Sequence, residues 1–368
     1  MQNDKINLSL IIPIGLMLFS FFFGAGNLIF PPVLGQMAGD NIGWGMLGFC
    51  LSGVGFPLLG VLAMAMKQSD NPDSIAMPMH PLYARAVTIL CALAIGPLFA
   101  IPRTAAVSFD TGIHSLLPAS CEAIGLPVYT VFFFVLTYFF SINPSKIIGH
   151  IGKFLSPMLL ICLAVLVVCV FVNPTGSLKM PNPDFAASPF FRGFQEGYNT
   201  MDLLAAILFG SITIKAIEAQ GITDKKVLTK LCSYAGLIAA FFLAIIYAAL
   251  AYTGALSINV FGVIPNGATL LSKICTYYMG FGGQVVLALI IFFACLTTSI
   301  GLTTAISGYF SELSNTIRAT GILHLCFQPG SSKLRSGKHH QVLHSCYLHA
   351  LSDYYRSGNS QHRSCNYP

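Results

Sequence analysis

Long apolar runs recur along this chain and leave few folds open to it. Hydrophobic residues make up 55% of the sequence and charged residues 9%, whereas soluble domains carry about 25% charged residues. A run of about 20 apolar residues is long enough to cross the hydrocarbon core of a bilayer as a helix. The sequence therefore predicts an all-α polytopic membrane protein.

The apolar runs predict eight membrane-spanning segments. They are Leu8–Phe30, Ile42–Met66, Ala84–Ile101, Val128–Ile142, Ile148–Val172, Tyr198–Ile214, Leu231–Ala255 and Gln284–Phe310. Loops on the amino-terminal side carry nine lysines and arginines against four on the other side. By the positive-inside rule, this bias predicts a cytoplasmic N-terminus. Met1–Asn7 is short and polar, and the apolar run after it is long enough to span, so no signal peptide is expected.

The character of the chain changes after Ser314. The residues before Asn315 include 13 basic and 12 acidic ones, and the residues after it include six basic and one acidic. Of the net charge of +6, the tail thus carries +5, and the charge gives no reason to expect nucleic-acid binding by the part before it. Residues 315–368 also hold six of the nine histidines and no apolar run long enough to span.

The tail is open to three interpretations: a disordered segment, a metal-binding segment, or a segment read out of frame. It is too rich in Cys, His, Leu and Tyr for a typical disordered segment, and it lacks the spacing of a zinc site. We favour the third interpretation, because back-translation with a one-nucleotide shift can restore an apolar helix. The nucleotide sequence would decide it.

The first apolar run is interrupted in its middle. Phe19–Phe23 is apolar, Gly24-Ala25-Gly26-Asn27 follows, and the run then resumes until Pro31-Pro32. Glycine lowers the cost of leaving helical geometry. Inside a membrane such a break persists only where it is buried in protein or lines a cavity. Broken helices are where secondary transporters bind substrates and ions, so this segment is the first candidate site. The alternative is a kink that only lets helices pack closely.

Five motifs follow one another in register along the chain. They are Phe22-Phe-Gly-Ala-Gly-Asn-Leu-Ile-Phe-Pro-Pro32, Gly96-Pro-Leu-Phe-Ala-Ile-Pro-Arg-Thr-Ala-Ala-Val-Ser-Phe109, Gly197-Tyr-Asn-Thr-Met-Asp-Leu-Leu204, Asn266-Gly-Ala268 and Phe293-Ala-Cys-Leu-Thr-Thr-Ser-Ile-Gly-Leu-Thr304. With these motifs the chain resembles the bacterial branched-chain amino acid carriers (the LIVCS or BrnQ family), over about Ile11 to Ser314.

The resemblance implies the inverted-repeat (5+5) fold of the neurotransmitter:sodium symporters and, in the family, about twelve helices. On that pattern residues 1–314 form a membrane transport domain. Residues 8–172 are its first repeat and residues 198–310 are part of its second. About eight helices are retained, and residues 315–368 depart from the family as an aberrant tail outside the membrane. The chain thus looks truncated or frameshifted after about residue 315.

The resemblance implies a symporter in the bacterial inner membrane that imports leucine, isoleucine and valine. The coupling cation is expected to be Na⁺, with H⁺ as the alternative, and import is expected to proceed by alternating access. No enzyme activity and no cofactor are expected, and no metal beyond the transported cation. A channel would show pore-lining rings of charge or a filter of backbone carbonyls, and no such pattern stands out in the sequence. A degenerate carrier that no longer transports is a further alternative, and the oligomeric state stays open.

A zwitterionic substrate needs partners for both of its charges. Helix N-termini favour anions, so N–H groups at Gly24, Ala25, Gly26 and Asn27 are expected to receive the carboxylate. The resemblance makes the sixth segment the counterpart of the first in the second repeat, which implies a second broken helix there. The polar stretch Gly197–Asp202 lies at its start.

Within that stretch, Asp202 and Thr200 are candidate substrate ligands. A carboxylate inside the membrane marks an ion path or substrate contact by default. The alternative is that Asp202 only caps the helix that follows it. Phe22, Phe23, Phe30 and Phe209 are candidates for the apolar part of the pocket.

The candidate cation ligands are oxygen atoms from two segments. In the sodium-symporter fold, two neighbouring hydroxyls of the eighth helix join carbonyls of the first, and the local match assigns these hydroxyls to Thr297 and Thr298. The partners are expected at Ser20 and Phe23, with the amide oxygen of Asn27. The alternative is that each threonine bonds to the carbonyl one turn back.

Overall fold

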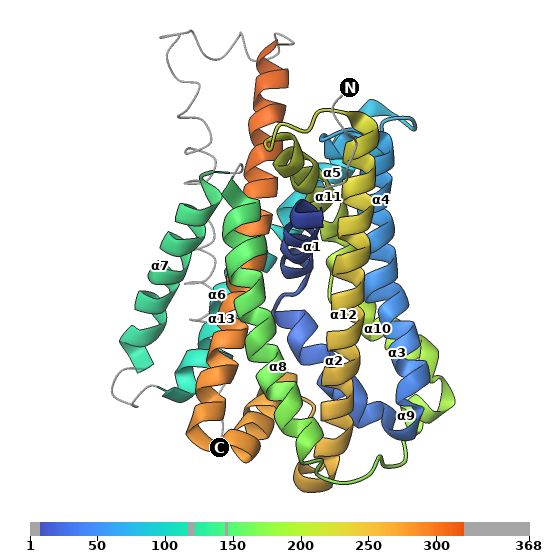
Figure 1. The fold of residues 1–368 in the computed structure, drawn as a ribbon, viewed down its shortest axis with the longest axis vertical. Helices are drawn as coiled ribbons and strands as arrows, with labels where there is room; N and C mark the ends of the chain where they lie inside the picture. Colours follow the sequence, from blue (N-terminus) through green and yellow to red (C-terminus); the bar gives the residue numbers. More distant parts are fainter. Residues whose placement is uncertain (1–7, 117–121, 144–145, 320–368) are drawn as a thin grey trace, which may run out of the picture.

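The computed structural model describes residues 8–116, 122–143 and 146–319, and the regular secondary structure of this part of the chain is all helical, without strands (Figure 1). The α-helices are α1 (Leu8–Phe22), α2 (Ala25–Ala38), α3 (Ile42–Cys50), α4 (Phe56–Lys67), α5 (Pro81–Ile95), α6 (Ala100–Ser108), α7 (Glu122–Ser141), α8 (Ser156–Val172), α9 (Pro183–Ala187), α10 (Pro189–Tyr198), α11 (Asp202–Glu218), α12 (Lys225–Phe261) and α13 (Gly267–Ala319). Short 3₁₀ turns lie at Gly39–Asn41, Pro72–Ile75 and His114–Leu116, and π-helical segments at Leu51–Gly55, Phe109–Ile113 and Ile148–Leu155.

Six helices of the described chain are long and apolar enough to cross a membrane, or seven if the bent pair α10 and α11 is one span. Each of the eight expected segments coincides with helix. The count is lower because the first expected segment is split: α1 is a shorter apolar helix, and α2 runs on through α3 and α4 as one candidate span. The prediction of an all-α polytopic membrane fold is confirmed.

Two of the spans contain a break. The first expected segment separates into α1 and α2 at Phe23 and Gly24. The sixth corresponds to α10 and α11, which are bent by 48° relative to each other. The sixth segment was expected to begin at Tyr198, but its first half starts earlier, at Pro189. The break thus falls between two helices of one span rather than at the end of the span.

The third expected segment, Ala84–Ile101, is also not continuous. Helix α5 ends at Ile95 and α6 begins at Ala100. Pro97 explains the difference, because proline disfavours helical geometry at the residue before it and lacks the N–H for the next hydrogen bond. After the turn, helix continues to Ile113, beyond the expected end.

Helices α1 and α2 lie end to end in the interior, between α8 and α12 in the view of Figure 1. Glycines bring α2 and α12 into backbone contact. A Cβ atom added to Gly35 would lie 1.8 Å from the carbonyl oxygen of Ala251, and one added to Gly254 would lie 2.0 Å from that of Pro32. Small residues at such contacts are how membrane helices pack without a hydrophobic driving force. Helix α2 is therefore held firmly against α12.

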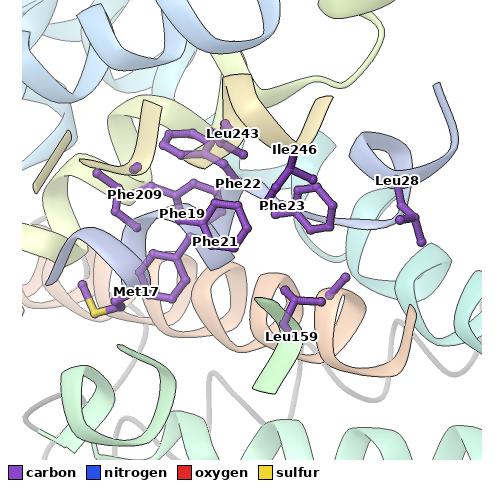
Figure 2. Close-up of a cluster of buried hydrophobic side chains, with 14 of the residues drawn as sticks. Met17, Phe19, Phe21, Phe22, Phe23, Leu28, Leu159, Phe209, Leu243 and Ile246 are labelled. Carbon is purple, nitrogen blue, oxygen red and sulfur yellow. The ribbon is translucent and has the colours of Figure 1, made fainter. Parts of the chain in front are cut away.

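Phenylalanines of α1 fill the space around the first break (Figure 2). Phe19 stacks on Phe23 with a centroid distance of 5.3 Å. Phe209 of α11 lies 5.2 Å from Phe21 in a stacked pair and 5.2 Å from Phe22 in an edge contact. Offset-stacked and edge contacts are the favoured aromatic geometries, so the end of α1 and the middle of α11 form one aromatic cluster.

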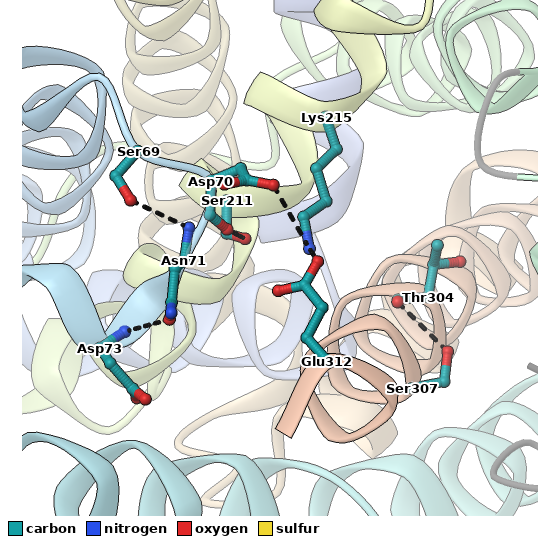
Figure 3. A network of polar contacts seen from close by, with 9 residues as sticks. All are labelled: Ser69, Asp70, Asn71, Asp73, Ser211, Lys215, Thr304, Ser307 and Glu312. Atoms are coloured by element: carbon teal, nitrogen blue, oxygen red, sulfur yellow. Dashed lines mark hydrogen bonds and ion pairs between the residues drawn. The ribbon is translucent and has the colours of Figure 1, made fainter. Parts of the chain in front are cut away.

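A network of charged side chains ties α11 to α13 and to the loop after α4 (Figure 3). Lys215 Nζ donates to Glu312 Oε1 at 2.5 Å and lies 3.9 Å from Asp70 Oδ2. Ser211 donates to the Asp70 carbonyl oxygen. Tyr309 of α13 donates to Asp73 Oδ1 at 2.8 Å. This end of the second broken segment is thus anchored by polar contacts rather than by apolar packing alone.

The prediction of an aberrant tail concerns residues 315–368, and from residue 320 onward these lie outside the described residues. Helix α13 continues past Ser314 to Ala319. The interpretation of the tail as a segment out of frame stays a prediction.

Candidate functional site

The first break is two residues long and is closed by a side chain. Gly24 has extended geometry, with φ −99° and ψ −169°. Its N–H donates to the Phe22 carbonyl at 2.9 Å, and also lies 3.3 Å from Oδ1 of Asn27. The second half begins at Ala25, three residues before the apolar run resumes at Leu28. The first-turn N–H groups of α2 therefore belong to Ala25, Gly26 and Asn27, three of the four residues that the sequence singled out.

The second break spans Asn199 to Met201 and is built without glycine. Met201 adopts a left-handed conformation, with φ 64° and ψ 12°, which is uncommon for a residue with a side chain. The Thr200 hydroxyl lies 2.8 Å from the Gly197 carbonyl oxygen and 3.1 Å from Asp202 Oδ2. Asp202 is the first residue of α11 and is 6% exposed.

The two breaks meet through a buried polar cluster. Asn27 Nδ2 donates to Asp202 Oδ2 at 2.5 Å and to the Tyr247 hydroxyl of α12 at 2.5 Å. Asn27 and Tyr247 are 2% and 0% exposed. Within the described residues, no basic side chain forms an ion pair with Asp202. The carboxylate is therefore hydrogen-bonded but lacks a cationic partner, and burying such a group is costly unless a cation or proton joins it.

A cavity opens beside this cluster. About 660 Å³ of unoccupied space, part of it open to solvent, is bounded by both breaks, by α5 and α6, and by α13. Ligand pockets of this kind are mostly apolar with a few polar groups. The lining residues fit that description: Gly24, Ala25, Gly26, Asn27, Arg103, Thr200 and Asp202 contribute polar groups and backbone, and Phe21, Phe22, Phe30, Phe99, Phe209 and Leu302 contribute apolar surface.

A second cluster of oxygen atoms lies where α1 ends against α13. Thr297 Oγ1 lies 3.0 Å from the Ser20 carbonyl oxygen, and Thr298 Oγ1 lies 3.1 Å from the Phe21 carbonyl oxygen. Thr297 Oγ1 is also 2.9 Å from the Phe293 carbonyl oxygen, one turn back on its own helix. The hydroxyl thus lies within hydrogen-bond distance of a carbonyl of α1 and of the carbonyl one turn back. Two hydroxyls have two protons for more than two carbonyl oxygens, so the cluster has an excess of acceptors and suits a hard cation.

Some predicted residues contribute differently from what was expected. The Ser20 hydroxyl pairs with Ser156 at 2.7 Å, so only its carbonyl faces the threonines. The hydrogen bonds of Thr297 and Thr298 run to Ser20 and Phe21, not to Phe23. The Phe23 ring stacks between Phe19 and Tyr247. The assignment of Phe23 and of the Asn27 oxygen to a cation stays a prediction.

Three residues at the site were not predicted from the sequence: Tyr247, Phe99 and Ala100. Tyr247 lies in a long apolar run, where a single tyrosine gives no signal of a polar contact. Phe99 and Ala100 line the cavity, and only their place in a long recognisable motif pointed to them.

Within the described residues, no group of three or more His, Cys, Asp or Glu side chains is arranged to hold a metal ion.

Sequence comparison matches residues 7–326 to the family model described as branched-chain amino acid transport protein. The chain is 46% identical over 312 residues to the branched-chain amino acid permease BrnQ of Bacillus subtilis (strain 168), covering 85% of this chain and 71% of that protein. It is 38% identical over 302 residues to the permease BrnQ of Escherichia coli (strain K12), covering 82% of this chain and 68% of that protein.

Among solved structures, the fold matches MhsT, crystallised in complex with L-phenylalanine. The TM-score is 0.57 at 17% identity, and the match covers 93% of this chain and 79% of that one. At this identity the likeness concerns the fold alone. The prediction of an inverted-repeat, sodium-symporter-like fold is confirmed.

Proposed function

This chain belongs to the family of branched-chain amino acid transport proteins, and we propose that it carries leucine, isoleucine and valine through a bacterial cytoplasmic membrane. The relatives are named as permeases, which supports transport rather than catalysis. The observation that carries the proposal is the contact between the two breaks, Asn27 Nδ2 to Asp202 Oδ2 at 2.5 Å, at the wall of a largely apolar cavity.

The polar groups of this cavity suit the two charges of an amino acid. The first-turn N–H groups of α2, from Ala25 onward, would receive the carboxylate, because a helix N-terminus favours an anion. Asp202 would receive the ammonium. The substrate would thereby supply the cationic partner that this buried carboxylate lacks among the described side chains.

The apolar wall suits a branched aliphatic side chain. Phe22, Phe30 and Phe209 line the cavity, and Phe209 is held in place by its ring contacts with Phe21 and Phe22. An apolar pocket rejects a polar side chain because water would be lost from it without replacement hydrogen bonds. The wall therefore favours leucine, isoleucine and valine over polar amino acids.

The coupling ion would be Na⁺, bound between α1 and α13. The carbonyls of Ser20 and Phe21 and the hydroxyls of Thr297 and Thr298 offer uncharged oxygen ligands. A cation here would link the end of α1 to α13. Thr298 also lines the substrate cavity, so ion and substrate would stabilise the same arrangement, and each would tighten the binding of the other.

H⁺ is the second candidate for the coupling ion. Asp202 favours it, because a buried carboxylate without a basic partner can be neutralised by a proton instead of a cation. Uptake that follows an imposed pH gradient in the absence of Na⁺ would support H⁺. Uptake that requires Na⁺ at constant pH would support Na⁺.

Transport would proceed by alternating access. The broken segments, α1 with α2 and α10 with α11, would move against a scaffold that includes α5, α6, α7 and α13, around a site near the middle of the membrane. The basic residues favour a cytoplasmic N-terminus. With that orientation, the charged network around Lys215 would lie on the cytoplasmic side.

The test is to purify the 368-residue chain, measure the binding of radiolabelled leucine in detergent, and measure its uptake into proteoliposomes with and without a Na⁺ gradient. Saturable binding with Na⁺-dependent uptake is the expected result. Binding without uptake in any gradient would support the degenerate carrier, and the absence of both would contradict the proposed function. Alanine, lysine and glutamate serve as competitors that should displace leucine poorly.

The cation site has its own control within α13. Thr298→Val removes a hydroxyl that contacts Ser20 and Phe21, whereas Thr304→Val removes one that bonds only to Ile300 of the same helix. We expect the first change to weaken the apparent Na⁺ affinity about tenfold, on the scale of a lost charge-assisted contact. The second change should leave the affinity unaltered. Equal effects of the two changes would argue against this site.

A further inference from the structure

Tyr247 stands out among the buried residues that the proposed mechanism does not use. It lies in the middle of α12 and is among the largest fully buried side chains of the described chain. It is not part of the cavity wall. A tyrosine is normally buried with its hydroxyl paired, and here its partner is the amide of Asn27 at 2.5 Å.

The ring and the hydroxyl of Tyr247 reach opposite sides of the first break. The ring stacks on Phe23 with a centroid distance of 6.1 Å. Phe23 directly follows α1, and its N–H bonds back to the Phe19 carbonyl of that helix. Phe49 packs edge-on against the same ring at 5.2 Å. The hydroxyl accepts its hydrogen bond from Asn27, in the first turn of α2. One side chain of α12 thus contacts both halves of the broken segment.

Asn27 passes this contact on to the second break. Its amide nitrogen donates one proton to Tyr247 and the other to Asp202, and its oxygen lies 3.3 Å from the Gly24 nitrogen. An amide group is planar, so these contacts together fix its plane. Without the tyrosine hydroxyl, one N–H group would be buried and unpaired, and only Asp202 and the Gly24 N–H would hold the amide.

We propose that Tyr247 is a positioning residue of the substrate site: its hydroxyl holds the Asn27 amide so that the first turn of α2 and the carboxylate of Asp202 face the cavity in a fixed arrangement. The inference rests on the proposed function, because it names what orients the two groups that would bind the substrate charges. Tyr247 acts through Asn27 and does not touch the substrate.

The test compares Tyr247→Phe with Tyr252→Phe in the full-length purified chain. Both changes remove a hydroxyl from α12 and keep a ring. Tyr252 packs on Phe171, away from the cluster, with a centroid distance of 5.1 Å. The first readout is hydrogen–deuterium exchange without any ligand. We expect Tyr247→Phe to speed exchange of the amides from Gly24 to Leu28 at least about threefold, because their local opening becomes easier, and Tyr252→Phe to leave them unchanged.

The second readout is the dissociation constant of leucine, corrected for the amount of folded protein. We expect Tyr247→Phe to raise it about tenfold, the scale of an unpaired buried donor, while the chain still folds. Unaltered exchange at residues 24–28 would overturn the proposal, as would equal effects of the two changes. A Tyr247→Phe chain that does not fold would also overturn it, since the hydroxyl would then serve folding.

The exchange experiment needs no substrate. If the unaltered chain bound no leucine, the proposed function would fail, while faster exchange in Tyr247→Phe would still support the positioning role of Tyr247.

Discussion

The two helix breaks that meet at the cavity are built in opposite ways. The first uses Gly24 in an extended conformation and is closed by the side chain of Asn27. The second uses no glycine at its turn and holds Met201 in a left-handed conformation. The first break lies between helices that touch α12 and α13, and the second begins the helix whose far end is held by Lys215.

The difference indicates a division of roles between the breaks. Glycine makes the first break inexpensive, so α1 and α2 can change their relative orientation at little cost. A non-glycine residue in left-handed geometry stores strain that the surrounding contacts must balance. The second break would therefore be the more rigid one, and it would present Asp202 in a constant position.

The largest effect is expected at the second break, from Asp202→Asn. The change keeps the shape and removes the charge that would pair with the substrate ammonium. We expect leucine binding to weaken about 100-fold, equivalent to about 2.8 kcal/mol at 1.4 kcal/mol per factor of ten, measured by radiolabelled leucine binding. The matched control is Asp224→Asn at the exposed N-cap of α12, which should bind leucine normally. If Asp202→Asn weakened leucine binding less than threefold, Asp202 would not be the partner of the substrate ammonium.

An intermediate effect is expected at the first break, from Gly24→Ala. The backbone geometry of Gly24 permits alanine, but the added Cβ would lie 3.2 Å from Thr298 Oγ1. The methyl group should push this hydroxyl away from the carbonyls of α1 and weaken the apparent Na⁺ affinity about fivefold, on the scale of one weakened hydrogen bond. Gly43→Ala meets no atom within 4 Å and serves as the control in the same assay. An unchanged Na⁺ affinity would mean that the backbone at Gly24 does not influence the cation cluster.

The smallest effect is expected from Met201→Gly, which relieves the left-handed strain. We expect the chain to gain about 0.5–1 kcal/mol of stability, because glycine adopts this conformation without the Cβ clash. Thermal unfolding in detergent measures the gain. Gln68→Gly, at the other non-glycine residue with positive φ in the described chain, should stabilise similarly without changing leucine binding. Destabilisation by Met201→Gly would mean that packing of the methionine side chain outweighs the strain.

This contrast also separates what the sequence could predict from what it could not. A glycine pair inside an apolar run predicts a break, and a carboxylate within a membrane segment indicates a site. Gly24 to Asn27 and Asp202 could therefore be predicted from the sequence. Met201 was not, because a left-handed methionine leaves no trace in composition or periodicity.

The partners across the site were accessible only in part. The hydroxyls of Thr297 and Thr298 were assigned through a family resemblance, whereas the contact of Tyr247 with Asn27 depends on how α12 packs against α2. Packing between distant segments is set by the whole fold, and the same holds for the turn at Pro97, where local chemistry allowed either a kink or a continuous helix.

The central claim is that both breaks form one substrate site, and cysteine protection tests it most directly. Ala25→Cys and Met201→Cys place one thiol at each break, on residues that line the same cavity, and Gly43→Cys serves as a control on α3. The rate of labelling by a small thiol reagent is measured at increasing leucine concentration. We expect leucine to protect both site cysteines from labelling with the same half-maximal concentration and not to protect the control. Protection of only one break, or protection of the two at clearly different concentrations, would contradict it.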